Sequence, residues 1–213
     1  MTDAWRTPAL LVGETVRLEP LTTEHAAGLA LAGDSAEVFE HLAGWDEMDE
    51  SVARLRIERT LANRQLVPWA QIDLRTGEVA GMTCYYDINS ELRTVAIGHT
   101  WLGKRSWRTG LNTEAKLLLL AHAFDTLGCV RVVWHADIRN ERSLSAIARL
   151  GATREGVLRK HKLRDDGSWR DTVTFSMLDD EWPAARQSLS RSATSAEQTA
   201  KAPTPPPSTQ SSP

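Results

Sequence analysis

The sequence lacks several features that would define other classes of protein. No apolar run approaches the roughly 20 residues of a membrane-spanning helix. The first residues do not combine a basic segment with an apolar core, as a secretory signal does. The two cysteines, Cys84 and Cys129, are too far apart in sequence to form a metal-binding pair. We therefore expect a cytoplasmic protein with free thiols, no bound metal and no membrane partner.

A surplus of positive charge is also missing. The chain has 213 residues and a formal net charge of −3, with 41% hydrophobic and 25% charged residues. This composition is ordinary for a globular protein, and the acidic balance argues against a general nucleic-acid-binding protein. The length suits one generous domain better than two.

The last part of the chain lacks the residues that form a core. From Arg191 to Pro213 there is no Val, Ile, Leu, Met or aromatic residue. Such a segment cannot bury enough apolar surface to offset the entropy lost on ordering. We therefore expect a functional domain over residues 1–183 and a C-terminal extension over 184–213, disordered from about 191.

Strand and helix signals alternate along the rest of the chain. Alternating and β-branched segments predict strands, and apolar residues at helical spacing predict helices. The order of the elements is typical of an α+β (mixed α/β) fold whose front half is largely antiparallel. The predicted strands are 16–21, 69–74, 78–88, 91–102 and 129–137, followed by a hairpin over 157–178. The predicted helices are 25–34, 51–66, 112–127 and 140–151.

The segment 101–116 joins a predicted strand to the strongest predicted helix. It carries Gly110 just before the helix start, with Lys104, Arg105 and Arg108 upstream. A helix N-terminus offers unpaired N–H groups and a partial positive charge, so the segment is a candidate phosphate cradle. It has neither the P-loop spacing nor the three spaced glycines of a dinucleotide site. A basic loop before an ordinary capped helix is the alternative.

A second polar segment follows the predicted strand 129–137. Asn140 stands where the next helix begins and is a good N-cap residue, with Ser143 three residues later. Two interpretations stay open. Either these residues only begin a helix, or they place an amide and a hydroxyl at the mouth of two splayed strands.

A set of short motifs occurs in order over roughly residues 14–183. Together they resemble the GNAT superfamily of acetyl-CoA-dependent N-acetyltransferases, specifically its RimJ/RimL-like branch of ribosomal-protein N-acetyltransferases. The resemblance implies a central, mostly antiparallel, twisted sheet with splayed middle strands, flanked by helices. The motifs are Arg17-Leu-Glu-Pro20, Ile97-Gly-His-Thr-Trp101, Trp107 through Lys116, Asn140-Glu-Arg-Ser143, Leu150-Gly-Ala152, Glu155-Gly-Val-Leu-Arg159, Asp171-Thr-Val and Glu181-Trp-Pro183.

The resemblance also implies where acetyl-CoA binds. In this family the backbone of the loop and helix start holds the pyrophosphate, and the pantetheine pairs with the splayed strand His99–Leu102. An Arg adds charge near the phosphates, and Asn140 hydrogen-bonds the pantetheine. The residues implied in CoA binding are Trp101, Leu102, Arg105, Arg108, Thr109, Gly110, Leu111, Asn112, Thr113 and Asn140.

The catalytic residues implied by the resemblance are fewer. Ser143 lies where a hydroxyl can protonate the departing thiolate. The branch usually has Glu-Ile-Gly on the splayed strand, but here the first residue of this motif is Ala96, so a common carboxylate is missing. His99, on the same strand, is the first candidate for the base. Other candidates are Asp46, Glu47 and His161.

The implied reaction is direct attack of a primary amine on the thioester in a ternary complex. At pH 7 about a tenth of a terminal α-amine is neutral, against a few parts in ten thousand of a lysine amine. A chain without an obvious carboxylate base therefore suits a protein N-terminal α-amine better. Acetylation of a small-molecule amine and a catalytically weak acyl-CoA-binding regulatory protein are the alternatives. A homodimer is compatible with the resemblance.

Overall fold

The computed structural model describes residues 3–42 and 48–200. One sheet runs through the molecule, with strand order β1-β2-β3-β4-β5-β6-β8-β7. Neighbouring strands are antiparallel except β5 and β6, which are parallel. The strands are β1 (Leu11–Val12), β2 (Val16–Pro20), β3 (Val67–Asp73), β4 (Val79–Asn89), β5 (Thr94–Leu102), β6 (Arg131–Asp137), β7 (Thr153–Leu163) and β8 (Trp169–Leu178).

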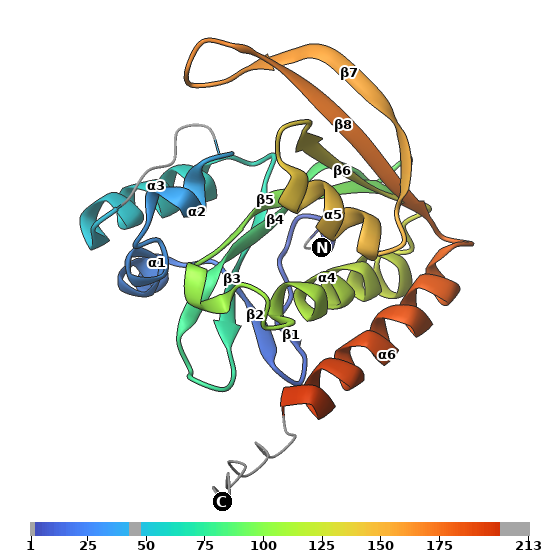
Figure 1. The fold of residues 1–213 in the computed structure, drawn as a ribbon, viewed down its shortest axis with the longest axis horizontal. Helices are drawn as coiled ribbons and strands as arrows, with labels where there is room; N and C mark the ends of the chain where they lie inside the picture. Colours follow the sequence, from blue (N-terminus) through green and yellow to red (C-terminus); the bar gives the residue numbers. More distant parts are fainter. Residues whose placement is uncertain (1–2, 43–47, 201–213) are drawn as a thin grey trace, which may run out of the picture.

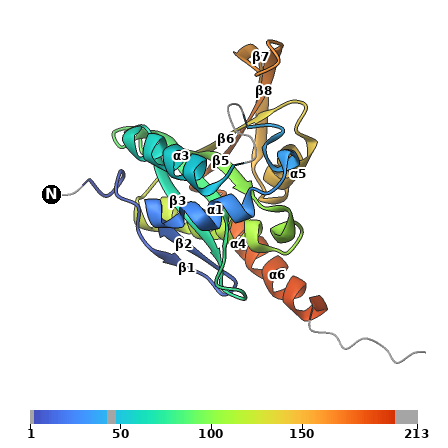
Figure 2. The same ribbon diagram turned by 90° about the vertical axis from the view of Figure 1, so that its left-hand side faces the viewer.

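Helices cover both faces of this sheet. In Figure 1, α1 to α3 lie on one side of the strands and α4 to α6 on the other; Figure 2 shows α1 and α3 face on. The longer helices are α1 (Ala26–Ala32), α3 (Glu50–Ala62), α4 (Leu111–Ala121), α5 (Glu141–Arg149) and α6 (Trp182–Ala200). The shorter helical segments are η1 (Thr23–His25), α2 (Ala36–Phe39), η2 (Lys104–Ser106) and the π-helical turn η3 (His122–Thr126).

Alternation along the strands divides the core between the two faces. Tyr85 and Ile97 belong to the larger cluster, with residues of α4, β6 and α6. Met82 and Cys84 belong to the smaller one, under α1 and α3. Successive strand residues point to opposite faces. The central strands β3, β4 and β5 therefore contribute to both cores, whereas the buried apolar residues of β2, β6 and β8 belong to the larger core alone.

The mixed α/β fold predicted from the sequence is confirmed, including the largely antiparallel sheet. The strand predicted at 129–137 begins at Arg131, and the predicted helix 51–66 begins at Glu50 and ends at Ala62. Asp49 caps that helix by accepting the N–H of Val52.

A long helix forms the C-terminal part of the described chain. Helix α6 runs through the boundary expected at 183–184 and continues to Ala200, beyond the start of disorder expected at about 191. Trp182 and Leu189, one on each side of that boundary, are both buried in the larger core. Their burial holds the first part of α6 on the domain, and the division at 183–184 with disorder from about 191 stays a prediction. Residues 201–213 lie outside the described residues.

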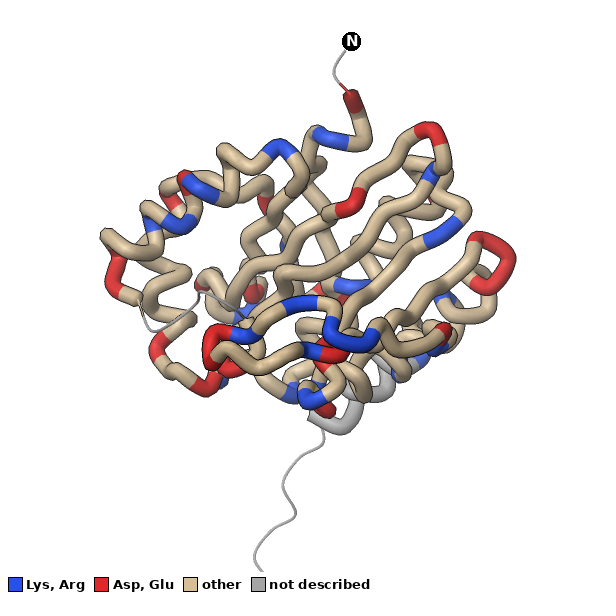
Figure 3. Tube along the Cα trace, turned by 90° about the horizontal axis from the view of Figure 1, so that it is seen from above, with Lys and Arg blue, Asp and Glu red and all other residues tan. Residues whose placement is uncertain are grey.

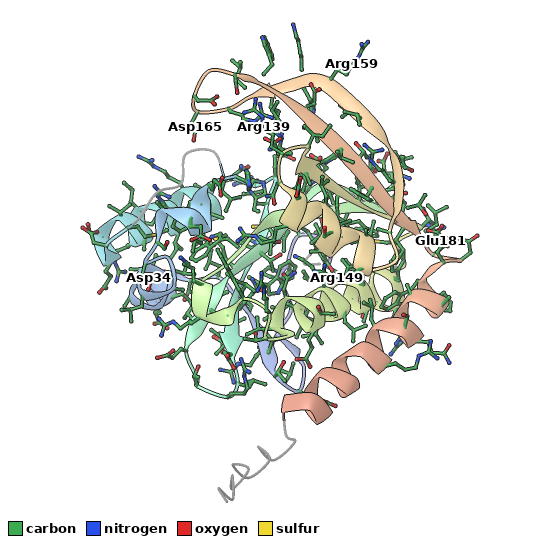
Figure 4. All side chains as sticks on the ribbon, viewed as in Figure 1. Asp34, Arg139, Arg149, Arg159, Asp165 and Glu181 are labelled. Carbon is green, nitrogen blue, oxygen red and sulfur yellow. The ribbon has the colours of Figure 1, made fainter. Side chains whose placement is uncertain are left out.

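The β7–β8 hairpin arches over one edge of the molecule (Figure 1). Its strands carry interspersed Lys and Arg, and acidic residues lie near its turn (Figure 3). The guanidinium of Arg164 binds both carboxylate oxygens of buried Asp137 at 2.7 Å, at the end of β6. Figure 4 shows Arg139 beneath the hairpin, whose turn carries Asp165. The hairpin is thus tied to the end of a central strand.

Candidate active site

The middle of the sheet opens between β5 and β6. These strands pair only over Thr94 to Ala96, and the last pair joins Ala96 to Val133. Beyond it, β5 stays paired with β4 as far as Leu102, while β6 stays paired with β8 as far as Asp137. The facing edges of β5 and β6 therefore diverge, and their backbone groups can pair with an extended ligand.

A β-bulge in β5 lies beside this opening. Two residues of β5, His99 and Thr100, lie opposite the single residue Thr83 of β4, and His99 has a φ of 48°. A bulge bends its strand and redirects the local backbone and side chains. Gly98 precedes the bulge under the ring of Tyr86, where a Cβ atom would come within 2.7 Å of a ring carbon. Glycine is therefore required where the strand bends.

Helix α4 begins in open space. Gly110 precedes it with a φ of 85°, and an added Cβ atom would meet no described heavy atom within 4 Å. The Gly110 carbonyl accepts the N–H of Thr113, while the N–H groups of Leu111 and Asn112 precede the first helical acceptors. The Oδ1 atom of Asn112 is buried without a hydrogen-bond partner among the described residues. This helix start fits an anionic ligand such as a pyrophosphate.

The basic residues before α4 differ in whether they form ion pairs. Lys104 pairs with Glu37 at 2.5 Å, and Arg105 pairs with Glu78 at 2.9 Å. Both ion pairs point away from the start of α4, because Glu37 lies on α2 and Glu78 lies in the β3–β4 turn. Arg108 is exposed, has a φ of 61° and forms no ion pair with a described residue. Of the two arginines predicted near the phosphates, Arg108 is therefore the better placed.

The loop before α4 also contacts the start of α5. The Nε1 atom of Trp107 donates to the Leu102 carbonyl at 2.7 Å, and the guanidinium of Arg142 lies 4.1 Å from the Trp107 ring centroid. Asn140 caps α5, because its Oδ1 atom accepts the Ser143 N–H at 2.9 Å. The predicted cap is thus present. Ser143 is half-buried.

A cluster of aromatic and histidine side chains lies across the strands near the opening. The Tyr86 hydroxyl is 2.9 Å from Nδ1 of His135, and the Tyr86 ring packs edge-on against His99, with 5.4 Å between centroids. The His161 ring follows, 6.2 Å from that of His135. These four residues come from β4, β5, β6 and β7. His99 and His161 were predicted from the sequence, whereas Tyr86 and His135 join them only through the strand pairing.

The cluster favours neutral histidines. Surrounding groups desolvate His99 and so lower its pKa, and the positive charge of Lys162 lowers the pKa further, although the residue as a whole is exposed. Burial also lowers the pKa of His135, against the opposing effect of Asp87. Burial raises the pKa of Tyr86. At neutral pH both imidazoles can accept a proton, while the phenol keeps its own.

Several other predicted residues fall elsewhere. The side chain of Trp101 is buried in the smaller core, with its ring 5.0 Å from that of Phe39, and its carbonyl accepts a hydrogen bond from Gln71 on β3. Leu102 is buried in the larger core. Both cysteines are buried, and burial raises the pKa of each thiol to about 12, which disfavours a reactive thiolate. Asp46 and Glu47 lie outside the described residues.

The part of the chain that the structure describes lacks two further features. No helix there is long and apolar enough to cross a membrane. In the same ranges, 3–42 and 48–200, no group of three His, Cys, Asp or Glu residues is arranged to hold a metal ion.

A sheet that splays beside an open helix start defines the acetyltransferase fold of the GNAT type. A family model described as Acetyltransferase (GNAT) domain matches residues 15–153. The chain therefore belongs to the GNAT family of acetyltransferases, with RimJ/RimL-like relatives.

Named relatives agree with this assignment. A GCN5-related N-acetyltransferase from Brucella melitensis is 30% identical, with a TM-score of 0.83 over 87% of this chain and 85% of that one. RimJ of Mycobacterium smegmatis, solved in complex with CoA-disulfide, shares the fold at 22% identity, with a TM-score of 0.71 over 83% of this chain and 88% of that one. YdaF of Bacillus subtilis, which its name proposes as a ribosomal N-acetyltransferase, is 32% identical over 51% of this chain. The match spans only 58% of the length of YdaF.

Proposed function

We propose that the protein transfers the acetyl group of acetyl-CoA to a primary amine, and that this amine is the N-terminal α-amine of a protein. The observation that carries the proposal is the opening between β5 and β6, followed in the chain by the open helix start at Gly110. The unpaired backbone groups and the unsatisfied Asn112 Oδ1 atom suit the polar parts of CoA. The CoA ligand of RimJ and the name of YdaF give further support.

In the proposed reaction, acetyl-CoA supplies an activated thioester. His99 or His135 takes up the proton that the amine loses as the C–N bond forms. The Ser143 hydroxyl gives a proton to the departing sulfur as the C–S bond breaks, and water returns that proton to Ser143. Neutral histidines suit this role because their pKa values are lowered.

The modest strength of these bases supports an α-amine acceptor. Imidazole is a weaker base than a lysine amine, so it deprotonates an α-amine of pKa near 8 more readily. For a lysine acceptor, the pKa of the amine or of the base would have to shift much further before the proton could be transferred. The carboxylate usual in this branch is absent, because its position is occupied by Ala96. This residue forms the last pair between β5 and β6.

A cytoplasmic location is part of the same proposal. Cys84 and Cys129 are free and buried, which suits a reducing compartment.

The experiment is an acceptor panel with acetyl-CoA, read by mass spectrometry and by release of free CoA thiol. The panel contains peptides with free N-termini, the same peptides with blocked N-termini and an internal lysine, and small amines. The proposal expects a gain of one acetyl group on free N-termini only. Acetyl transfer to small amines alone would instead indicate a small-molecule amine acetyltransferase. CoA binding without thiol release on any acceptor would instead indicate an acyl-CoA-binding regulatory protein.

A further inference from the structure

A lysine is buried beneath the bulge of β5. Lys116 is the sixth residue of α4 and is 5% exposed. Its Nζ atom lies 2.6 Å from Oγ1 of Thr100 and 3.0 Å from Oγ1 of Thr83. No described carboxylate lies within ion-pair distance of it. A buried ammonium without a counter-ion is costly, so the presence of lysine here requires an explanation.

The partners of Lys116 are the residues that form the bulge. Thr100 is one of the two β5 residues opposite Thr83, and the two threonine Oγ1 atoms are 2.8 Å apart. The Thr100 hydroxyl also donates to the Gly98 carbonyl at 3.2 Å. A continuous chain of hydrogen bonds therefore runs from α4 through the bulge to the backbone just before His99.

The hydrogen-bond count suits a neutral amine. A neutral amine has two N–H donors, and two threonine oxygens accept them. The Thr83 hydroxyl can then donate to Thr100, and Thr100 to the Gly98 carbonyl, so every donor is used. An ammonium would bring a third proton without an acceptor among the described residues. Burial lowers the pKa of Lys116 to about 7, with a smaller opposing effect of Cys84 on β4.

We propose that Lys116 is a positioning residue that fixes the bulge of β5 from beneath and so holds the backbone of residues 98–100 in the geometry that receives the thioester. The inference rests on the proposed function. It explains why a polar group stands where an apolar one would pack: without the amine, only the bond between the two threonines and the bond from Thr100 to the Gly98 carbonyl remain, so the bulge can relax. A misplacement of about 1 Å near a reacting centre can cost on the order of 100-fold in rate.

The test is Lys116→Met, which keeps the length of the side chain and removes its donors. We expect kcat for acetyl transfer to fall by about 10-fold or more, while the CoA affinity from calorimetry changes less than about twofold because the Gly110 helix start is untouched. The melting temperature should stay the same or rise, since a buried amine has been replaced by an apolar group. A merely structural residue would instead lose stability and leave kcat unchanged, which would overturn the proposal.

Two threonine variants give matched controls. Thr100→Val keeps the shape and removes the hydroxyl, so it should reproduce the loss of kcat. Thr100→Ser keeps the hydroxyl and should retain wild-type kcat. Equal kcat values for the two variants would contradict the inferred hydrogen-bond chain.

A readout independent of acetyl transfer separates this inference from the proposed function. The backbone amide NMR signals of Gly98, His99 and Thr100 should shift in Lys116→Met and stay near wild-type positions in Thr100→Ser. If the wild-type protein transfers acetyl to no acceptor, the proposed function fails, while these signals still test the role of Lys116. Unshifted signals in Lys116→Met would overturn it.

Discussion

The two sides of the opening between β5 and β6 are assembled in different ways. The side proposed to bind CoA consists of consecutive residues, 108–113, at the start of one helix. The side proposed to receive the acceptor consists of Tyr86, His99, His135 and His161, which come from four different strands. The first depends on local geometry, and the second depends on strand register. The proposed chemistry therefore divides into a local binding function and a non-local proton-transfer function.

The largest expected effect tests the acceptor side. Replacing both His99 and His135 by Ala should lower kcat/KM for the acceptor by about 100–10,000-fold, the usual range for a lost general base. CoA affinity from calorimetry should change less than about twofold, because the helix start is intact. In the wild type, protonation of the base should lower kcat/KM only at a pH below the ordinary imidazole range, since both imidazole pKa values are lowered and the base must be unprotonated.

The control for this variant is His25→Gln, since His25 interacts with Thr22 and Glu19 away from the opening. It should retain wild-type kcat/KM. If kcat/KM of the double-histidine variant stays within a few-fold of the wild-type value, water or another group takes the proton. Proton transfer could then not be assigned to the side of the opening that carries the histidines.

The second effect lies at the boundary between the two sides. Ser143→Ala should lower kcat by roughly 10–100-fold, because a thiolate can leave unprotonated, though more slowly. The KM for acetyl-CoA should stay near its wild-type value. Asn140→Ala offers the contrast: it removes the α5 cap, should cost about 1 kcal/mol in the free energy of unfolding and should weaken CoA binding. Unchanged steady-state turnover in Ser143→Ala would show that Ser143 does not protonate the thiolate and only belongs to the first turn of α5.

The third effect tests the CoA side. Gly110→Val places a β-branched side chain at a φ of 85° and fills the open space at the helix start. CoA affinity should fall by roughly 5–30-fold, equivalent to about 1–2 kcal/mol, as measured by calorimetry. The matched control is Gly128→Val, beyond the other end of the same helical segment, where φ is 67° and the space is also open. Equal CoA affinities in the two variants would show that CoA does not bind at Gly110.

The smallest effect concerns stability rather than turnover. The pKa of Lys116 is about 7 in the folded protein and near 10.4 in an unfolded chain. Between these values the unfolded chain binds more protons, so the free energy of unfolding rises with pH, by about 1 kcal/mol from pH 7 to 8. Chemical denaturation should show this rise in the wild type relative to Lys116→Met, and a constant difference well below pH 7. A difference independent of pH across this range would mean that Lys116 stays charged when folded.

Much of the fold could be predicted because its signals are local. The helix start after Gly110 and the Asn140 cap follow from residue types at fixed spacing, and both are present. The burial of Leu189 in the larger core could not be predicted, because it depends on contact with residues far away in the chain. His135 was passed over because its partner Tyr86 is 49 positions away.

By itself, the sequence determined the order of the elements, the open helix start and the family motifs, because each depends on residues close together in the chain. Only the tertiary structure decided that Tyr86 meets His135, and that Lys116 lies beneath the bulge. A shift of one residue in strand register would turn such side chains to the opposite face. Pairing across strands therefore determines which side chains meet, and pairing is fixed by packing of the whole sheet.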